Sequence, residues 1–157
     1  MRLQDHLVRC TQKALDDVCR AALAVPADHR EWSVGGVSRS TLSQMQEIAV
    51  SAEAFLEILA GGPEVDAFAV IGSATGRGKG IATLEECVER ARTSTVELCR
   101  RIAETTDREL EREISMPFGG GMRVSLAEFL GLHHWNLVYH LGQINQIQLA
   151  LGDNVMH

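Results

Sequence analysis

The stretch SLAEFLGLHHWNLVYHLGQINQIQLALGD, from Ser125 to Asp153, decides the fold of this chain. Ser125 and Glu128 form a capping box that starts a helix, and Gly152 marks its end. Apolar side chains cover nearly the whole circumference of this helix, and a helix without a polar face is usually buried on several sides. The sequence therefore predicts one long, largely buried helix here.

Three polar side chains interrupt this apolar surface. At about 100° per residue, Asn136, His140 and Gln143 project from the most apolar arc of the helix. A polar group that is buried without a partner costs roughly 1–3 kcal/mol. Something must satisfy these side chains, and the identity of that partner is the functional question that the sequence poses.

The composition describes one globular domain, residues 1–157, with 45% hydrophobic and 23% charged residues. The net charge of −6 argues against a general binder of nucleic acids or anionic membranes, because both need a basic surface. Every apolar run is shorter than the ~18 residues that span a bilayer. The N-terminus lacks the apolar core of a signal peptide, so we expect a cytoplasmic protein.

The four cysteines agree with a reducing compartment. Cys10 and Cys19 are too far apart on one predicted helix to form a disulfide, and Cys87 and Cys99 are still farther apart on another. We expect reduced thiols that pack as small apolar side chains. Cysteine–histidine catalysis stays open, since any of these thiols could meet a histidine in space, but no spacing favours it.

Three further helices precede the last one. Apolar residues at steps of three and four predict helices over residues 2–24, 40–60 and 83–106. Residues 63–80 are expected to form a long irregular connection, and residues 112–126 a short extended arm or hairpin with a Pro/Gly turn. The predicted fold class is all-α, a four-helix bundle with long crossover connections.

The spacing Asn136-x-x-x-His140 places two side chains on one helix face about 6 Å apart, as in helices that bind metals. Glu47, at the edge of the apolar arc of residues 40–60, is the carboxylate that we expect to face them as a third ligand. A neutral amide is a poor ligand for zinc or nickel. Spacing alone therefore favours the alternative, a buried hydrogen-bond cluster of Asn136, His140 and Gln143 without a metal.

Two other patterns are weaker. His133 lies on nearly the same face as His140, but about 10 Å along the helix axis, so that sharing one metal would be strained. The segment GSATGRGKG, residues 72–80, is similar to a phosphate-binding loop. A P-loop, however, has Ser or Thr after its lysine, and Gly80 stands there instead. We expect a surface loop rather than a nucleotide site.

The segment YHLGQINQIQLALGD, residues 139–153, resembles the sequence that closes the bundle in the DinB/YfiT-like superfamily of small bacterial four-helix proteins. RSTLSQMQEIA, residues 39–49, resembles the part of helix two where that family carries its first metal ligand. The resemblance implies a divalent metal held by three histidines, one on helix two and a His-x-x-x-His pair on helix four. It also implies metal-dependent thiol S-transfer, or isomerisation with a low-molecular-weight thiol.

Residue by residue, His140 matches the last histidine of that pair, whereas Asn136 and Glu47 stand where the other two are expected. The resemblance thus makes Glu47, Asn136 and His140 the predicted metal ligands and places Gln143 behind them at the cofactor site. Nickel, zinc or manganese would act as a Lewis acid that binds a thiol cofactor as the thiolate.

Loss of two imidazoles should lower the affinity for a borderline metal. Either the site binds a harder or weaker metal, or it has become a polar pocket without one. The alternative to an enzyme is therefore a non-catalytic small-molecule-binding or stress-response module whose metal site has decayed. The apolar circumference of residues 125–153 further predicts a homodimer, because one bundle covers only part of it.

Overall fold

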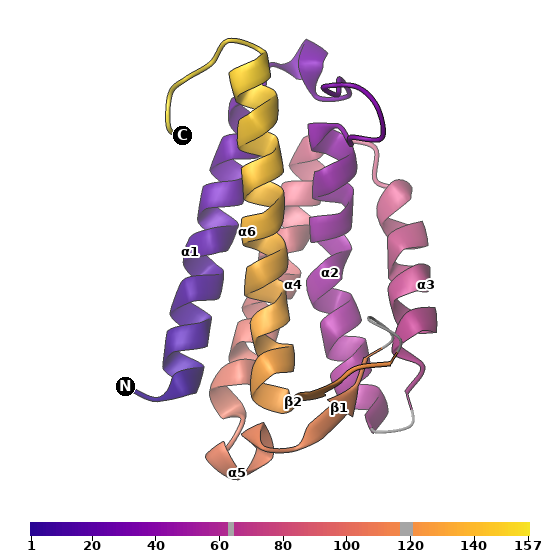
Figure 1. Cartoon of the computed structure of the whole chain (residues 1–157), viewed down its shortest axis with the longest axis vertical. Helices are drawn as coiled ribbons and strands as arrows, with labels where there is room; N and C mark the ends of the chain where they lie inside the picture. The colour runs from indigo at the N-terminus through magenta and orange to yellow at the C-terminus, as the bar shows by residue number, and fades with distance from the viewer. Residues whose placement is uncertain (63–64, 117–120) are drawn as a thin grey trace.

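The computed structural model describes residues 1–62, 65–116 and 121–157, and four long helices form most of it (Figure 1). These are α1 (Leu3–Ala24), α2 (Thr41–Gly61), α4 (Leu84–Glu104) and α6 (Leu126–Ala150). Helices α1 and α2 each pack against both α4 and α6, which closes the bundle. All four predicted helices are confirmed.

Local sequence signals set the ends of these helices. Ser125 and Thr83 each accept a hydrogen bond from a backbone N–H three residues on, and Glu128 and Glu86 complete the two capping boxes. Ser40 caps the start of α2 with its side-chain oxygen. Such caps are worth about 1 kcal/mol each, because they satisfy N–H groups that the helix leaves unpaired.

The connection between α2 and α4 is a helix, α3 (Ala67–Lys79), where the sequence predicted an irregular loop. Asp66 caps it by accepting a hydrogen bond from the backbone N–H of Ala69. The helix packs along α2, and this contact offsets the low helix propensity of its three glycines, about 1 kcal/mol each. At Gly78 the backbones are so close that a Cβ atom would lie 2.4 Å from the carbonyl oxygen of Gln46.

Helix α3 carries the chain back along the bundle, so that α4 runs parallel to α2 (Figure 1). This confirms the four-helix bundle with a long crossover connection. Three short elements complete the fold: the 3-10 helix η1 (Ala27–His29), helix α5 (Asp107–Leu110) and a hairpin of β1 (Glu113–Ser115) and β2 (Arg123–Ser125). The hairpin is confirmed, with Ile114 opposite Val124. The Pro/Gly turn predicted within it falls partly on residues 117–120, outside the described residues.

Helix α6 is buried along one broad side only. Phe129, Leu137 and Ile144 are fully enclosed in the core. Four large apolar side chains of the helix instead point to solvent, with exposed fractions of 46–61%; these are Trp135, Val138, Tyr139 and Leu149. Burial on several sides, as the sequence predicted, therefore does not occur within a single chain. In the part of the chain that the structure describes, every helix is too short or too polar to cross a lipid bilayer.

Candidate functional site

Glu47 is the centre of a polar cluster between α2 and α6. Its Oε1 atom accepts hydrogen bonds from Asn136 Nδ2 at 3.1 Å and from His140 Nε2 at 3.0 Å. Its Oε2 atom forms an ion pair with Nη1 of Arg39 at 2.5 Å. The structure thus brings together the three residues that were predicted as metal ligands. Their binding of a metal stays a prediction.

The helix geometry explains this convergence. Asn136 and His140 are one turn apart on α6, and Glu47 faces both of them from α2. Gln44, one turn earlier on α2, places its Oε1 atom 3.2 Å from His140 Nδ1. His140 is fully buried, and the hydrogen bond that its Nε2–H donates to Glu47 replaces one that the ring would make with water.

The neighbours of Glu47 keep its carboxylate ionised. The hydrogen bond from His140 lowers the pKa of Glu47 most, burial opposes this effect, and Arg39 lowers the pKa further, to about 2. The carboxylate therefore carries its negative charge throughout the neutral pH range, and it acts only as a hydrogen-bond acceptor.

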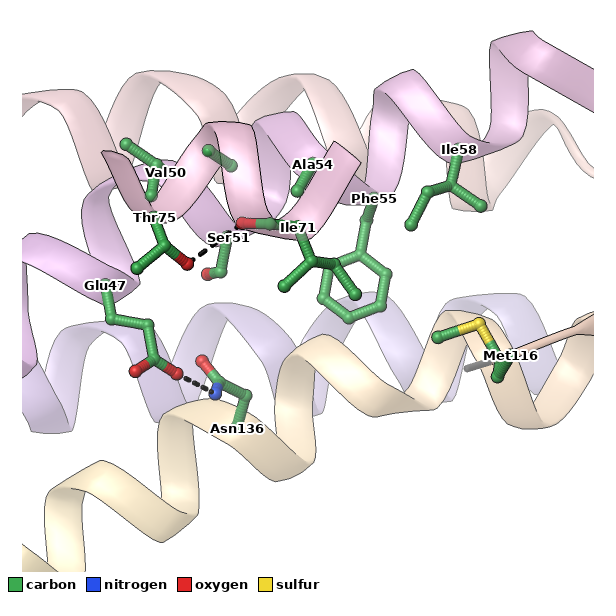
Figure 2. A pocket seen from close by; sticks show the side chains of 11 residues that line it. Glu47, Val50, Ser51, Ala54, Phe55, Ile58, Ile71, Thr75, Met116 and Asn136 are labelled. Carbon is green, nitrogen blue, oxygen red and sulfur yellow. Dashed lines mark hydrogen bonds between the residues drawn. The ribbon is translucent and has the colours of Figure 1, made fainter. Parts of the chain in front are cut away.

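Glu47 and Asn136 also line a cavity of about 130 Å³ that is bounded by α2, α3 and α6 (Figure 2). Apolar side chains form most of its wall: Val50, Ala54, Phe55, Ile58, Ile71, Ala74 and Met116. The hydroxyl groups of Ser51 and Thr75 also border it. The cavity is therefore an apolar space whose polar groups gather near Glu47.

One polar atom at this cavity has no partner. Since a carboxylate only accepts hydrogen bonds, the amide nitrogen of Asn136 must face Glu47, and the amide oxygen is turned away. Figure 2 shows this oxygen pointing into the pocket. The oxygen is buried, and no hydrogen-bond donor within the described residues reaches it. An unsatisfied buried acceptor destabilises the fold by about 1–3 kcal/mol, so an occupant that donates to it would be stabilised here.

Ser51 links the cavity to a second buried histidine. His133 Nδ1 lies 3.2 Å from Ser51 Oγ, and Nε2 lies 3.0 Å from Thr95 Oγ1. Burial, reinforced by His134, lowers the pKa of His133 to about 4, so its ring is neutral. The Ser51 hydroxyl donates to the carbonyl of Ile48 at 3.0 Å. When Thr95 donates to Nε2 and Nδ1 donates to Ser51, the network is satisfied and Ser51 is not activated as a nucleophile.

Gln143, the predicted cofactor-site residue, lies apart from this cluster. It lines a surface groove of about 520 Å³, formed by residues 34–39 and the outer part of α6. Arg39 and Gln44 line the same groove. Arg39 therefore borders the groove on one side and contacts Glu47 on the other. Sequence reasoning missed Arg39, because it precedes α2 in an irregular segment without periodicity. Gln44 could have been found, because it shares a helix face with Glu47.

A divalent metal fits this cluster poorly. The contact between Glu47 and His140 places a proton on Nε2, so a metal would have to displace that proton and the hydrogen bond to Glu47 before it could bind there. Arg39 adds a fixed positive charge. Arg39 would repel a divalent ion bound at Glu47 and so would offset the attraction of the carboxylate for that ion. Within the described ranges, His, Cys, Asp and Glu side chains form no group of three that could hold a metal.

Comparison with known proteins identifies the fold. The sequence matches no protein-family model and no curated protein. Among solved structures, it is similar to YfiT from Bacillus subtilis, described as a probable metal-dependent hydrolase with an unusual four-helix-bundle topology. The TM-score is 0.74 at 14% identity, over 96% of this chain and 89% of YfiT. It is also similar to the DinB-like protein YjoA from the same organism, with a TM-score of 0.68 at 17% identity, over 97% of this chain and 96% of YjoA.

A mycothiol-dependent maleylpyruvate isomerase also matches, with a TM-score of 0.72 at 13% identity. The match covers 92% of this chain but only 61% of the isomerase. At these identities the similarity concerns the fold. The chain therefore has the DinB/YfiT-like four-helix-bundle fold that the resemblance of residues 139–153 predicted.

Proposed function

We propose that this protein is a small-molecule-binding module whose ligand occupies the cavity beside Glu47 and Asn136. The observation that carries the proposal is the buried, unpartnered Oδ1 atom of Asn136, which faces an otherwise apolar space. The ligand is therefore a small apolar molecule with one N–H or O–H donor. Apolar cavities of about 150 Å³ bind benzene, so the volume suits a molecule near that size.

The polar cluster supports this function by holding the acceptor in place. Glu47 fixes the amide nitrogen of Asn136 at 3.1 Å, and Arg39 in turn fixes Glu47. The Asn136 oxygen is therefore oriented before a ligand arrives, which lowers the entropy lost on binding. The apolar wall supplies affinity through burial, and the unpartnered Asn136 oxygen selects ligands that carry a donor.

The competing proposal is metal-dependent thiol chemistry. It is favoured by the meeting of Glu47, Asn136 and His140, and by the similarity to folds described as metal-dependent or mycothiol-dependent. Nickel, zinc or manganese and a low-molecular-weight thiol would then be the cofactors. The poor fit of the cluster for a metal counts against it, because Arg39 would first have to leave Glu47.

Binding of matched probes to the full chain tests the proposal. We expect benzyl alcohol to bind more tightly than toluene, by roughly the five-fold that one neutral hydrogen bond of about 1 kcal/mol supplies. Asn136→Leu should remove this preference, and Asn145→Leu, at an exposed position of the same helix, should retain it. Chemical-shift titration gives both affinities. If the wild type binds neither probe, or if the preference survives Asn136→Leu, the proposal is wrong.

Elemental analysis distinguishes ligand binding in the cavity from metal-dependent thiol chemistry. Untagged protein purified without chelators would contain nearly one nickel, zinc or manganese ion per chain, and His140→Ala would lose it, if the cluster were a metal site. We expect the metal content of the wild type to be far below this level.

A further inference from the structure

Arg39 stands where a divalent cation would have to act. Its Nη1 atom pairs with Glu47 Oε2 at 2.5 Å, and its Nη2 atom lies 3.4 Å from His140 Nδ1. One guanidinium group thus contacts both the carboxylate and the imidazole that the DinB/YfiT-like resemblance assigns to a metal. It does so with two nitrogens, as the planar fork of an arginine allows.

The surroundings of Glu47 also need a positive charge. The carboxylate is half-buried, and a buried anion is stable only when it is paired. Within the described residues, Glu47 forms ion pairs with Arg39 and with His140, which counts as charged only when protonated. Arg39 is therefore the permanent cation paired with Glu47, because a guanidinium keeps its charge whereas an imidazole is charged only when protonated.

The remaining hydrogen bonds fit this arrangement as well. The Asn136 nitrogen, rather than its oxygen, faces Glu47, and a metal ligand would need the opposite orientation. The side-chain nitrogen of Gln44 donates to the carbonyl oxygen of Arg39 at 3.3 Å, which ties the backbone of Arg39 to the first turns of α2. With the guanidinium present, both oxygens of Glu47 are therefore paired.

We propose that the Arg39 guanidinium replaces the metal cation of this site, so that the wild-type cluster excludes divalent metals and removal of Arg39 leaves a vacancy that a metal can fill. The inference does not depend on the proposed ligand of the cavity. It assigns Arg39 a positioning and charge-balancing role that a neutral side chain could not supply.

The test compares metal binding by the full chain with and without the guanidinium. Arg39→Met keeps most of the aliphatic stem and removes the charge, and Arg39→Met with Asn136→His adds a second imidazole. We expect zinc to bind the double variant with one-to-one stoichiometry and at least about 100-fold more tightly than the wild type, because the repulsion is gone and a borderline metal prefers imidazole to an amide. Isothermal titration and elemental analysis measure this.

Two controls make the result specific to the cluster. Arg30→Met removes another arginine–glutamate pair, Arg30 Nη1 with Glu85 Oε1 at 2.7 Å, and should leave metal binding at the wild-type level. Adding Glu47→Gln to the double variant should abolish the gained affinity. Methylguanidinium should raise the melting temperature of Arg39→Met more than that of the wild type, because it refills the vacancy.

Two outcomes would overturn the proposal. One is stoichiometric binding of zinc by the wild type with an affinity similar to that of the double variant. The other is a folded double variant, verified by circular dichroism, that binds no metal. If Asn136→His prevents folding, the single variant Arg39→Met still decides through its zinc affinity and its response to methylguanidinium.

Discussion

Acidification should destabilise this protein through the buried imidazole of His133. The ring is fully buried in the bundle, and its two nitrogens contact the hydroxyl groups of Ser51 and Thr95. Neither hydroxyl can balance a positive charge, so the folded state holds the ring neutral. Its pKa falls from 6.5 to about 4, chiefly because of burial.

The direction in which stability changes with pH follows from proton uptake by His133. Between pH 6.5 and about 4, His133 binds a proton in the unfolded chain but not in the folded one. Stability is therefore complete above the unfolded pKa and decreases as the pH falls through this window. The difference between the two pKa values corresponds to about 3 kcal/mol, a large fraction of the total stability of a small domain. Glu47 contributes only at lower pH, because its pKa changes from 4.5 to about 2.

Urea denaturation at several pH values between about 7 and 4.5 measures this loss. The variant His133→Gln retains an amide that can bond with both hydroxyls but cannot take up a proton. We expect its stability to depend less on pH than that of the wild type, by about 2–3 kcal/mol over the window. His6→Gln, at an exposed position of α1, is the matched control for loss of a histidine. Equal loss of stability in the wild type and in His133→Gln would refute the reasoning.

Two further predictions concern packing and assembly. Gly78→Ala should lower the free energy of unfolding by about 1–3 kcal/mol, because the new Cβ would lie 2.4 Å from a backbone oxygen of α2. At Gly76 a Cβ would meet nothing within 4 Å, so Gly76→Ala should raise the free energy of unfolding by up to about 1 kcal/mol. Urea denaturation of both variants measures the difference. The apolar surface of α6 predicts a homodimer, which sedimentation at micromolar concentration should detect. Trp135→Glu should dissociate this dimer. A wild type that sediments only as a monomer would contradict the prediction.

The fold could be predicted because its helices carry strong local signals. Capping boxes at Thr83 and Ser125 and continuous apolar periodicity placed α4 and α6 within a few residues. Helix α3 lacks such signals, since its glycines oppose helix formation and its stability comes from the contact with α2. Tertiary packing overrode propensity there, and a single sequence does not reveal which surface will supply that packing.

The site could be predicted only in part, for a related reason. Asn136 and His140 share a face because of helix geometry alone, and Glu47 was predicted to face them because it is the carboxylate at the edge of the apolar arc of residues 40–60. Arg39 carries no periodic signal, because it precedes α2 in a segment without regular structure. Its role depends on where that segment folds back over the bundle. Sequence patterns therefore could not assign a role to Arg39, the residue that we propose excludes a metal from the hydrogen-bond cluster.

Arg39 also connects the cluster to the cavity. Because Arg39 and His140 hold Glu47, the carboxylate is fixed in a position from which it can only accept a hydrogen bond from the Asn136 nitrogen. That contact is what turns the Asn136 oxygen into the apolar cavity. Without the guanidinium, Glu47 keeps the hydrogen bond from His140 but loses the ion pair that fixes its second oxygen, so the orientation of the amide is less strongly held. The charge of Arg39 thus opposes a divalent cation at Glu47, and the same contacts orient the acceptor that the proposed ligand would use.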